Sequence, residues 1–168
     1  VEHGINAFGF VFQEDSSKKA NKEKMSELGL ENSPKIGKLK QGEAIEWDGQ
    51  EITPEEVIEE MPGRKIVYSG DTSKCENLID YAKKADLLIH EATCLHELIE
   101  ERKGHTSAQQ AAEIAEEANV EKLVLTHFSR RYRNNEEVLL EEARKTFNET
   151  ELGEDGKSFE LRPHRPEH

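Results

Sequence analysis

Three short apolar runs in this chain are each followed at once by polar residues that can bind metals or transfer protons. Lys65–Tyr68 (KIVY) leads into Ser69-Gly70-Asp71-Thr72, Asp86–His90 (DLLIH) leads into Glu91-Ala92-Thr93, and Lys122–Thr126 (KLVLT) leads into His127-Phe128-Ser129. Buried strands that alternate with helices predict a mainly parallel sheet covered by helices. In such a sheet the polar residues at the carboxyl ends of the strands converge on one edge.

Helical patterns separate these strands. Asn77–Lys84 and Glu136–Phe147 both read as helices, the second with Leu139, Ala143 and Phe147 inward. A capping box marks a further helix start, with Ser107 as the N-cap and Gln110 at the third helical position. The helix that follows carries a face of small residues that can lie close on a sheet: Ala108, Ala111, Ala112, Ala115 and Ala118.

The remaining segments are less regular. Asn6–Gln13 predicts an aromatic strand, and Gly42–Ile52 predicts a small hairpin around Asp48-Gly49. The rest of the stretch from Asp15 to about Pro62 is polar, weakly periodic and rich in turn residues. From Asn148 onward we expect a polar, frayed tail, since it ends in Pro163, Pro166 and two histidines.

Composition limits the size of the core. The 168 residues suffice for one compact domain, but only 34% are apolar and 35% are charged, so the core is modest or is completed from elsewhere. No apolar run is long enough for a bilayer, and no signal-peptide pattern is present. The two cysteines, Cys75 and Cys94, suit a reducing cytoplasm. They are expected to be ordinary buried thiols rather than metal ligands.

Charge is distributed unevenly. The net charge of −13 argues against a surface that is generally suited to nucleic acid. Glu14–Lys40 nevertheless holds seven lysines against five acids, a local charge of +2 that leaves −15 for the rest. Such a segment can dock a phosphate backbone. On charge alone, lysines that only aid solubility are the favoured alternative.

Asp71, His90, Glu91 and His127 all follow predicted strands, so a carboxylate and an imidazole could meet at neighbouring strand ends. That pairing suits zinc. Taken alone, Asp71 is more simply explained as a helix cap. It is the joint pattern that favours a metal site.

Five motifs in order resemble the ribonuclease Z family of the metallo-β-lactamase superfamily, the endonucleases that process the 3′ ends of transfer RNA. The resemblance extends from Val1 to about Phe147. Thr-Ser stands at 106–107 where the family more often has Ser-Thr. The matching segments are Val1–Phe10 (VEHGINAFGF), Gly70-Asp71-Thr72, His90-Glu91-Ala92-Thr93, Gly104-His105-Thr106-Ser107 and Thr126–Tyr132 (THFSRRY).

The resemblance implies an α/β fold, the metallo-β-lactamase-like αββα sandwich, here only as its C-terminal half. The family's His-x-His-x-Asp-His motif does not occur in this sequence. Residues 1–147 would form the half-domain, with 14–61 as an inserted flexible arm, and 148–168 would be a polar tail that is poorly ordered at its end. In the complete enzyme one sheet face would be covered by the other half. We therefore expect this chain to self-associate or to pair with a partner chain.

The implied activity is zinc-dependent hydrolysis that removes the 3′ trailer from precursor tRNA. The implied partners are precursor tRNA, the N-terminal half of the domain and, in the complete enzyme, a second subunit of a cytoplasmic homodimer; no membrane is implied. This chain alone is expected to be inactive. The alternatives are a non-catalytic fragment that binds tRNA or pairs with another chain, and another hydrolase of the superfamily, which the arm-like insertion disfavours.

The resemblance also implies roles for single residues. His3 and His127 would each ligate one of two zinc ions, and Asp71 would bridge both. His105 would be the general acid, oriented by Glu91. His90 is expected to fix its loop by hydrogen bonding.

Arg131 would contact phosphate, although it could instead pair with Glu136 or Glu137. The Glu14–Lys40 segment resembles the stem of the family's arm, with Pro34-Lys35-Ile36-Gly37-Lys38 where a Gly-Pro-rich tip is usual. This resemblance makes RNA contact the favoured role of its lysines: Lys18, Lys19, Lys22, Lys24, Lys35, Lys38 and Lys40.

Overall fold

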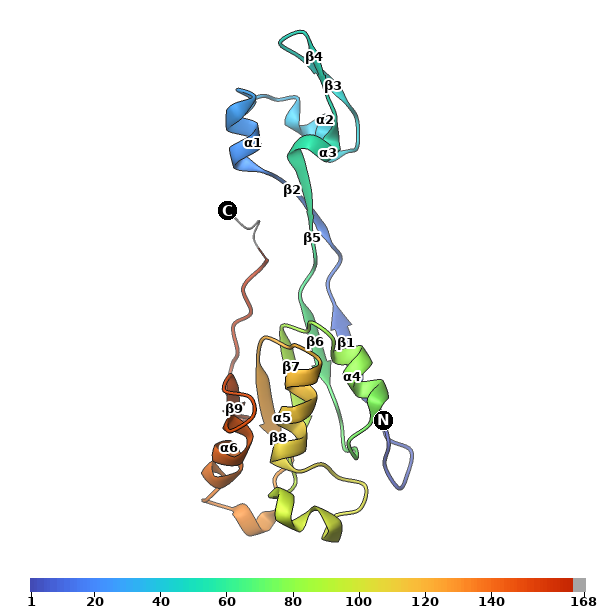
Figure 1. The fold of residues 1–168 in the computed structure, drawn as a ribbon, viewed down its shortest axis with the longest axis vertical. Helices are drawn as coiled ribbons and strands as arrows, with labels where there is room; N and C mark the ends of the chain where they lie inside the picture. The colour runs from blue at the N-terminus through green and yellow to red at the C-terminus, as the bar shows by residue number, and fades with distance from the viewer. Residues whose placement is uncertain (165–168) are drawn as a thin grey trace. The chain divides into compact units, whose positions relative to one another are not determined.

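A computed structural model describes residues 1–164 and divides the chain into two compact units. We call Val1–Gln13 with Arg64–Leu161 the sheet unit, and Glu14–Gly63 with residues 162–164 the inserted unit. Figure 1 shows the path of the chain through both. The tail was expected to be frayed, and its last residues, including Pro166 and His168, lie outside the described residues.

The sheet unit contains five strands in the order β1-β6-β7-β8-β9. Strands β6, β7, β8 and β9 run parallel to one another, and β1 is antiparallel to β6. The predicted mainly parallel sheet is therefore confirmed. The strands are β1 (Phe10–Gln13), β6 (Lys65–Tyr68), β7 (Leu87–Glu91), β8 (Leu123–Thr126) and β9 (Thr150–Leu152).

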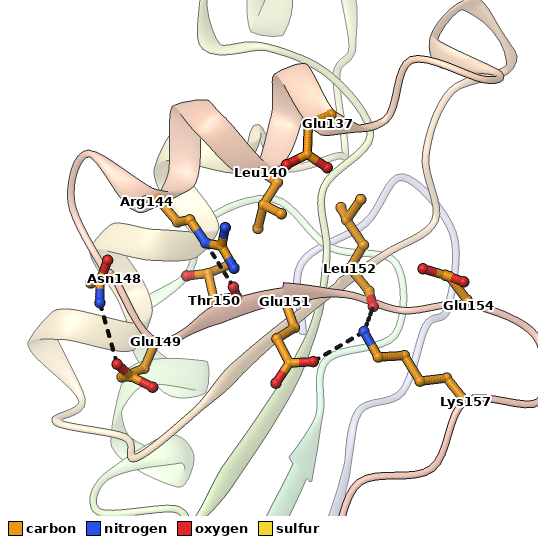
Figure 2. A pocket seen from close by; sticks show the side chains of 10 residues that line it. All are labelled: Glu137, Leu140, Arg144, Asn148, Glu149, Thr150, Glu151, Leu152, Glu154 and Lys157. Carbon is orange, nitrogen blue, oxygen red and sulfur yellow. Dashed lines mark hydrogen bonds and ion pairs between the residues drawn. The ribbon is translucent and has the colours of Figure 1, made fainter.

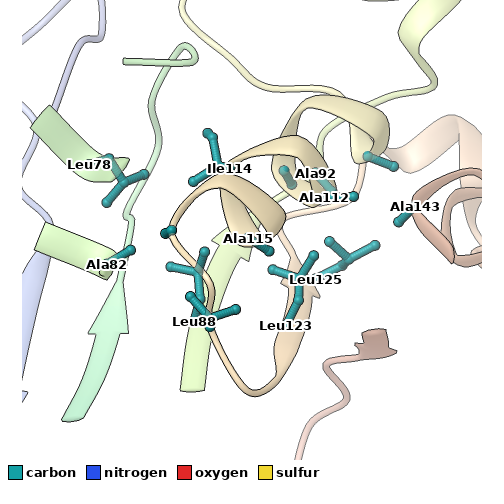
Figure 3. Packing of buried hydrophobic residues seen from close by; sticks show 14 of the residues in the cluster. Leu78, Ala82, Leu88, Ala92, Ala112, Ile114, Ala115, Leu123, Leu125 and Ala143 are labelled. Carbon is teal, nitrogen blue, oxygen red and sulfur yellow. The ribbon is translucent and has the colours of Figure 1, made fainter. Parts of the chain in front are cut away.

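Helices cover one face of this sheet. The capping box at Ser107 is present, with the Ser107 hydroxyl accepting from the backbone N–H of Gln110. The alanine face that follows is buried, and Figure 3 shows Ala112 and Ala115 packed above Leu88 and Leu123. The helices of the unit are α4 (Glu76–Ala82), α5 (Ala108–Glu117) and α6 (Glu137–Arg144), with 3₁₀ helices at His96–Glu101 and Arg130–Tyr132.

The other face of β1 and β6 carries exposed aromatic side chains. Phe10 pairs with Tyr68 across the two strands, so their side chains share a face. Phe10 is 55% exposed, Phe12 60% and Tyr68 38%. Val67, on the opposite face, is buried in the main core. The motif resemblance to the family implies an apolar sheet face of this kind, which the other half of the domain would cover.

Strand β9 corrects the expectation of an irregular tail after Asn148. It pairs in parallel with β8 through Thr150, Glu151 and Leu152. Thr150 is buried, and its carbonyl accepts a hydrogen bond from Nε of Arg144 at 3.1 Å. A three-residue polar strand has too little periodicity to be recognised from sequence, and it is held by these tertiary contacts.

The inserted unit has its own small core, which the polar sequence does not predict. A two-stranded ribbon pairs β2 with β5, and the expected hairpin pairs β3 with β4. Asp48 (φ 47°) and Gly49 (φ 76°) form the left-handed two-residue turn of that hairpin, as Asp-Gly turns do. The elements are β2 (Ser17–Ala20), α1 (Lys22–Glu27), α2 (Ile36–Lys40), β3 (Ile45–Trp47), β4 (Gln50–Ile52), α3 (Pro54–Val57) and β5 (Ile58–Met61).

Buried side chains from these short elements meet in one cluster: Met25, Leu30, Leu39, Ile45, Ile52 and Val57. The indole Nε1 of Trp47 donates to the carbonyl of Leu28 at 2.8 Å. The Pro34–Lys38 segment, which was expected at a loop tip, is partly helical because Ile36 begins α2 and packs against this core.

Candidate metal centre

The carboxyl ends of the parallel strands bring three loops together. Tyr68 of β6 is in register with Ile89 of β7, and Glu91 of β7 with Thr126 of β8. The residues that follow β6 and β8 therefore meet beside the end of β7. This register places Asp71 and His127 next to each other, as their positions after the strands predict.

Asp71, His105 and His127 form the candidate centre. Their ligand atoms all lie within 4.8 Å of one another. Nδ1 of His127 is 3.5 Å from a carboxylate oxygen of Asp71. The His105 and His127 rings stack with centroids 5.4 Å apart. Both His127 and Asp71 are partly exposed, with 49% and 38% of their side chains accessible, so the centre can be reached from solvent.

Each of the three loops has a residue in the left-handed backbone region. Gly70 has φ 61° and Gly104 has φ 83°. A Cβ on Gly70 would lie 2.5 Å from the carbonyl oxygen of Phe8, so no other residue fits there without a shift of the backbone. His127 has φ 58° although it is not glycine. Non-glycine residues are uncommon in this region, and the surrounding structure holds them there.

Glu91 holds His105 in place from behind. This carboxylate has 1% of its side chain exposed and accepts a hydrogen bond from Nδ1 of His105 at 2.9 Å. Three further donors converge on it: the backbone N–H groups of Thr72 and Thr106 and the hydroxyl of Thr93. Sequence reasoning assigned no role to these threonines. Their place in the Gly-Asp-Thr, His-Glu-Ala-Thr and Gly-His-Thr-Ser motifs was the available signal.

The His3 side chain lies next to that of His105. Its ring makes an edge contact with that of His105, with centroids 5.0 Å apart, and its Nδ1 donates to the carbonyl of Gly104 at 2.6 Å. The chain beside it is fixed by the Ser73 N–H, which donates to the carbonyl of Glu2. His3 is not one of the three residues whose ligand atoms converge. Its Nε2 is the ring atom that remains for a ligand.

Arg131 is exposed in the 3₁₀ helix Arg130–Tyr132. Within residues 1–164 no ion pair joins it to Glu136 or Glu137, so the pairing alternative finds no support. Both cysteines are buried and free, as expected for ordinary thiols. Burial raises the pKa of the Cys94 thiol, which keeps it protonated.

His90 is fully buried, and its Nδ1 lies 2.7 Å from the carbonyl oxygen of Glu91. A carbonyl oxygen only accepts, so Nδ1 carries the proton. Nε2 is then a buried acceptor with no hydrogen-bond partner in the described part of the chain. The expected loop-fixing role agrees with this geometry.

Burial lowers the pKa of His90 below its ordinary value of 6.5. The hydrogen bond to the Glu91 carbonyl and the negative charge of Glu91 both raise this pKa, but by less. The folded protein therefore binds fewer protons than the unfolded chain below that pH. Stability is fully present above pH 6.5 and is lost as the pH falls below it. We expect His90→Asn to reduce the pH slope of the unfolding free energy by up to about 1.4 kcal/mol per pH unit in this range. Urea unfolding of both proteins over a pH series measures this, and equal slopes would contradict it.

The lysines of the inserted unit differ in their surroundings. Lys18 and Lys19 of β2 lie opposite Glu60 and Glu59 of β5. Nζ of Lys35 donates to the carbonyl of Glu46 at 2.7 Å and lies over the Trp47 ring. The other four predicted RNA-binding lysines are exposed on the two short helices: Lys22, Lys24, Lys38 and Lys40.

A separate hollow of about 400 Å³ lies between α6, β9 and the segment after β9. Figure 2 shows its charged residues, with Lys157 reaching Glu151 and Arg144 reaching Thr150. Lys122 also pairs with Glu151, and the two lysines lower the pKa of that carboxyl. The lining includes none of the predicted site residues. It is therefore separate from the candidate centre.

Comparison with known proteins decides the family. The family model for the beta-lactamase superfamily domain matches residues 34–128, which is more than half of the chain. This chain belongs to the beta-lactamase superfamily. The metallo-beta-lactamase fold protein YhfI from Bacillus subtilis is 27% identical, with a TM-score of 0.51 over 63% of this chain and 44% of that one. The expected metallo-β-lactamase-like α/β fold is thereby confirmed.

Within the superfamily, the chain is similar to ribonuclease Z. It is 43% identical to ribonuclease Z of Archaeoglobus fulgidus over 166 residues, which cover 96% of this chain and 54% of that protein. Identity to ribonuclease Z of Enterococcus faecalis is 40% over 166 residues, or 96% and 53% of the two chains. The resemblance seen in the motifs is confirmed. The chain spans about half the length of these curated relatives. In residues 1–164 no helix is long and apolar enough to cross a membrane.

Proposed function

We propose that this chain is part of a zinc-dependent endoribonuclease that removes the 3′ trailer from precursor tRNA. The observation that carries the proposal is the convergence of Asp71, His105 and His127 at the strand ends, with His105 held by the buried Glu91. Its similarity to ribonuclease Z supports RNA as the substrate class.

The donor set fits a metal ion. Zinc accepts imidazole nitrogen and carboxylate oxygen at about 2.0–2.2 Å, so the ligand atoms around one ion lie about 4 Å apart or less. Ligating histidines usually donate their second ring N–H to a carboxylate or a carbonyl. His3 does so to Gly104. We propose that Asp71 and His127, whose ligand atoms converge, would hold zinc together with His3, whose Nδ1 is taken by Gly104, and that Asp71 would serve both ions. Bound zinc would polarise the phosphodiester and lower the pKa of the attacking water.

His105 is proposed as the general acid. Because Nδ1 is engaged by Glu91, Nε2 is free to carry the proton that the leaving 3′-oxygen needs. In the reaction, the oxygen of water adds to phosphorus and the water releases one proton to solvent, the bond from phosphorus to the 3′-oxygen breaks, and that oxygen takes the proton from His105, which solvent then reprotonates. Arg131, exposed and without an ion pair to Glu136 or Glu137, is assigned to a phosphate of the RNA.

We further propose that a segment with the His-x-His-x-Asp-His motif supplies the remaining ligands, which makes this chain the C-terminal half of the domain. That segment would cover the face that carries Phe10, Phe12 and Tyr68. Phe10 and Phe12 already stack on each other, with centroids 6.5 Å apart. The complete enzyme is proposed to be a homodimer. The cytoplasm is its proposed compartment, since the free Cys75 and Cys94 fit reducing conditions.

A non-catalytic, tRNA-binding role is the second candidate. It is favoured by the small number of converging ligands and by the exposed lysines of the inserted unit. The inserted unit is proposed as the arm that grips tRNA. Both roles require RNA binding, and they differ in whether the strand-end centre acts on it.

Reconstitution of cleavage separates the two roles. Labelled precursor tRNA and zinc are incubated with this chain alone, with a polypeptide that carries the missing motif, and with both together. We expect negligible cleavage by this chain alone and zinc-dependent cleavage by the mixture, with the activity lost in His105→Ala. A mixture that forms a stable complex and binds RNA but never cleaves it would favour the non-catalytic role. Strong zinc-dependent cleavage by this chain alone would contradict the proposed ligand set.

A further inference from the structure

A half-buried carboxylate of α6, that of Glu142, contacts the starts of two other helices. Its Oε2 accepts from the backbone N–H of Gln109 at 3.0 Å. Both of its oxygens accept from the backbone N–H of His96, at 3.0 and 3.1 Å. Gln109 lies in the first turn of α5, and His96 begins the 3₁₀ helix His96–Glu101. The first N–H groups of a helix have no partner inside it, so a carboxylate stabilises them by hydrogen bonding and by its charge.

The two chain segments that Glu142 contacts are joined to each other and carry His105. Backbone hydrogen bonds of 3.0 Å link residues 93–94 with residues 106–108. His105 directly precedes the second of these segments. The N–H groups that Glu142 accepts lie within two residues after each segment. Glu142 therefore holds both sides of the loop pair in which His105 is placed.

Glu142 also connects this loop pair to the chain that follows His127. Strand β8 ends at Thr126, and the chain continues through His127 and the 3₁₀ helix Arg130–Tyr132 into α6. Two hydrogen bonds between uncharged groups link the same parts: Ser129 N–H to the Thr93 carbonyl at 3.0 Å, and Leu95 N–H to the Tyr132 hydroxyl at 3.1 Å. Hydrogen bonds to a carboxylate are roughly twice as strong as such neutral ones. Glu142 is thus the strongest of these links.

We propose that Glu142 is a positioning residue that fixes the His105 ring relative to His127. The two rings stack with centroids 5.4 Å apart, so their relative position depends on how the two loops are held together. In the proposed reaction the acid must reach the 3′-oxygen of a phosphate at the metal centre, and a displacement of about 1 Å can cost roughly a hundredfold in rate. The inference rests on the proposed function, since it assigns a further residue to the same reaction.

Single-turnover cleavage of labelled precursor tRNA by the reconstituted two-polypeptide complex tests the effect on the reaction. Glu142→Ala removes both contacts, whereas Glu142→Gln keeps one acceptor oxygen, which can take the place of Oε2 opposite Gln109. We expect Glu142→Ala to lower the rate at saturating enzyme about tenfold to a hundredfold, with the Kd for the RNA unchanged. The rate of Glu142→Gln should lie between those of Glu142→Ala and wild type. Glu141→Ala, at the exposed neighbouring position of α6, should cleave as wild type does. A smaller folded fraction does not change the rate at saturating enzyme, so a lower rate reports on positioning.

A measurement on this chain alone needs no cleavage. In NMR spectra of the chain with isotope-labelled histidine, the stacked ring of His105 shifts the ring-proton signals of His127, and nuclear Overhauser effects connect the two rings. We expect both effects to weaken in Glu142→Ala and to stay unchanged in Glu141→Ala. Circular dichroism verifies that each variant is folded. Should Glu142→Ala not fold, Glu142→Gln provides the same comparison with a smaller expected change.

The two measurements separate failure of this inference from failure of the proposed function. If the wild-type complex does not cleave precursor tRNA, the proposed function fails, while the NMR comparison still decides whether Glu142 holds the two rings together. If the wild-type complex cleaves and folded Glu142→Ala cleaves at the same rate, the positioning role is wrong. Ring signals in Glu142→Ala that match those of wild type would also overturn it.

Discussion

Replacing Glu91 by glutamine is expected to lower the free energy of unfolding by about 2–4 kcal/mol. Each carboxylate oxygen of Glu91 faces two donors. One oxygen accepts from Thr72 N–H at 2.8 Å and from Nδ1 of His105 at 2.9 Å. The other accepts from the Thr93 hydroxyl at 2.7 Å and from Thr106 N–H at 3.1 Å.

Glutamine keeps the shape of this side chain but replaces one acceptor by an NH₂ group. In either orientation that group meets a buried backbone N–H, of Thr72 or of Thr106, so a donor faces a donor. Urea unfolding measures the effect. Glu97→Gln, at an exposed position in the 3₁₀ helix His96–Glu101, is the matched control and should change stability by less than about 0.5 kcal/mol. A Glu91→Gln protein as stable as wild type would show that these four hydrogen bonds are not formed as described.

Substituting Asp71 by asparagine should reduce RNA cleavage by the reconstituted two-polypeptide enzyme by about a thousandfold or more. The proposed bridging carboxylate neutralises part of the charge of two zinc ions, and an amide cannot do so. Metal ions contribute several kcal/mol to catalysis of this kind, and each 1.36 kcal/mol is a factor of about ten in rate.

The control for this substitution is Asp80→Asn. Asp80 is an exposed residue of α4 that pairs with Lys83 on the surface. Single-turnover cleavage of labelled precursor tRNA at saturating enzyme compares both variants with wild type. Asp80→Asn should cleave at the wild-type rate. If Asp71→Asn cleaves within tenfold of wild type, Asp71 is not the bridging ligand.

The sheet and its site were accessible from sequence because their signals are local. Lys65–Tyr68, Asp86–His90 and Lys122–Thr126 are short apolar runs, and each forms a strand within a residue of its expected start. Parallel pairing then brings their carboxyl ends together, which is why Asp71 and His127 could be expected as neighbours. The capping box at Ser107 has the predicted hydrogen bonds because such a box depends on only four consecutive residues.

Other features depend on contacts between distant residues and could not be predicted in this way. The position of His3 is set by the hydrogen bonds of Glu2, whose carbonyl accepts from the Ser73 N–H and whose N–H donates to the Thr72 hydroxyl. Strand β9 is held by the pairing with β8 and by Arg144. The short helices of the inserted unit, of four to six residues, are too short for a clear periodic signal, and they are stabilised by the small core around Leu30 and Leu39.

The lysines show the same limit. In the sequence, Lys18, Lys19 and Lys35 cannot be told apart from the other four lysines of the Glu14–Lys40 segment. Strand register places the first two opposite glutamates, and Lys35 lies over Trp47. Which of these lysines has a partner within the inserted unit is therefore a property of the fold.

The most direct test of the central claim is the zinc content of the complex between this chain and the polypeptide with the missing motif. Equilibrium dialysis followed by elemental analysis compares the wild-type complex with complexes of Asp71→Asn and His127→Ala. We predict two zinc ions in the wild-type complex and a clear loss in both variants, with little zinc on the isolated chain. Undiminished zinc in both folded variants would contradict a metal centre at the ends of β6 and β8.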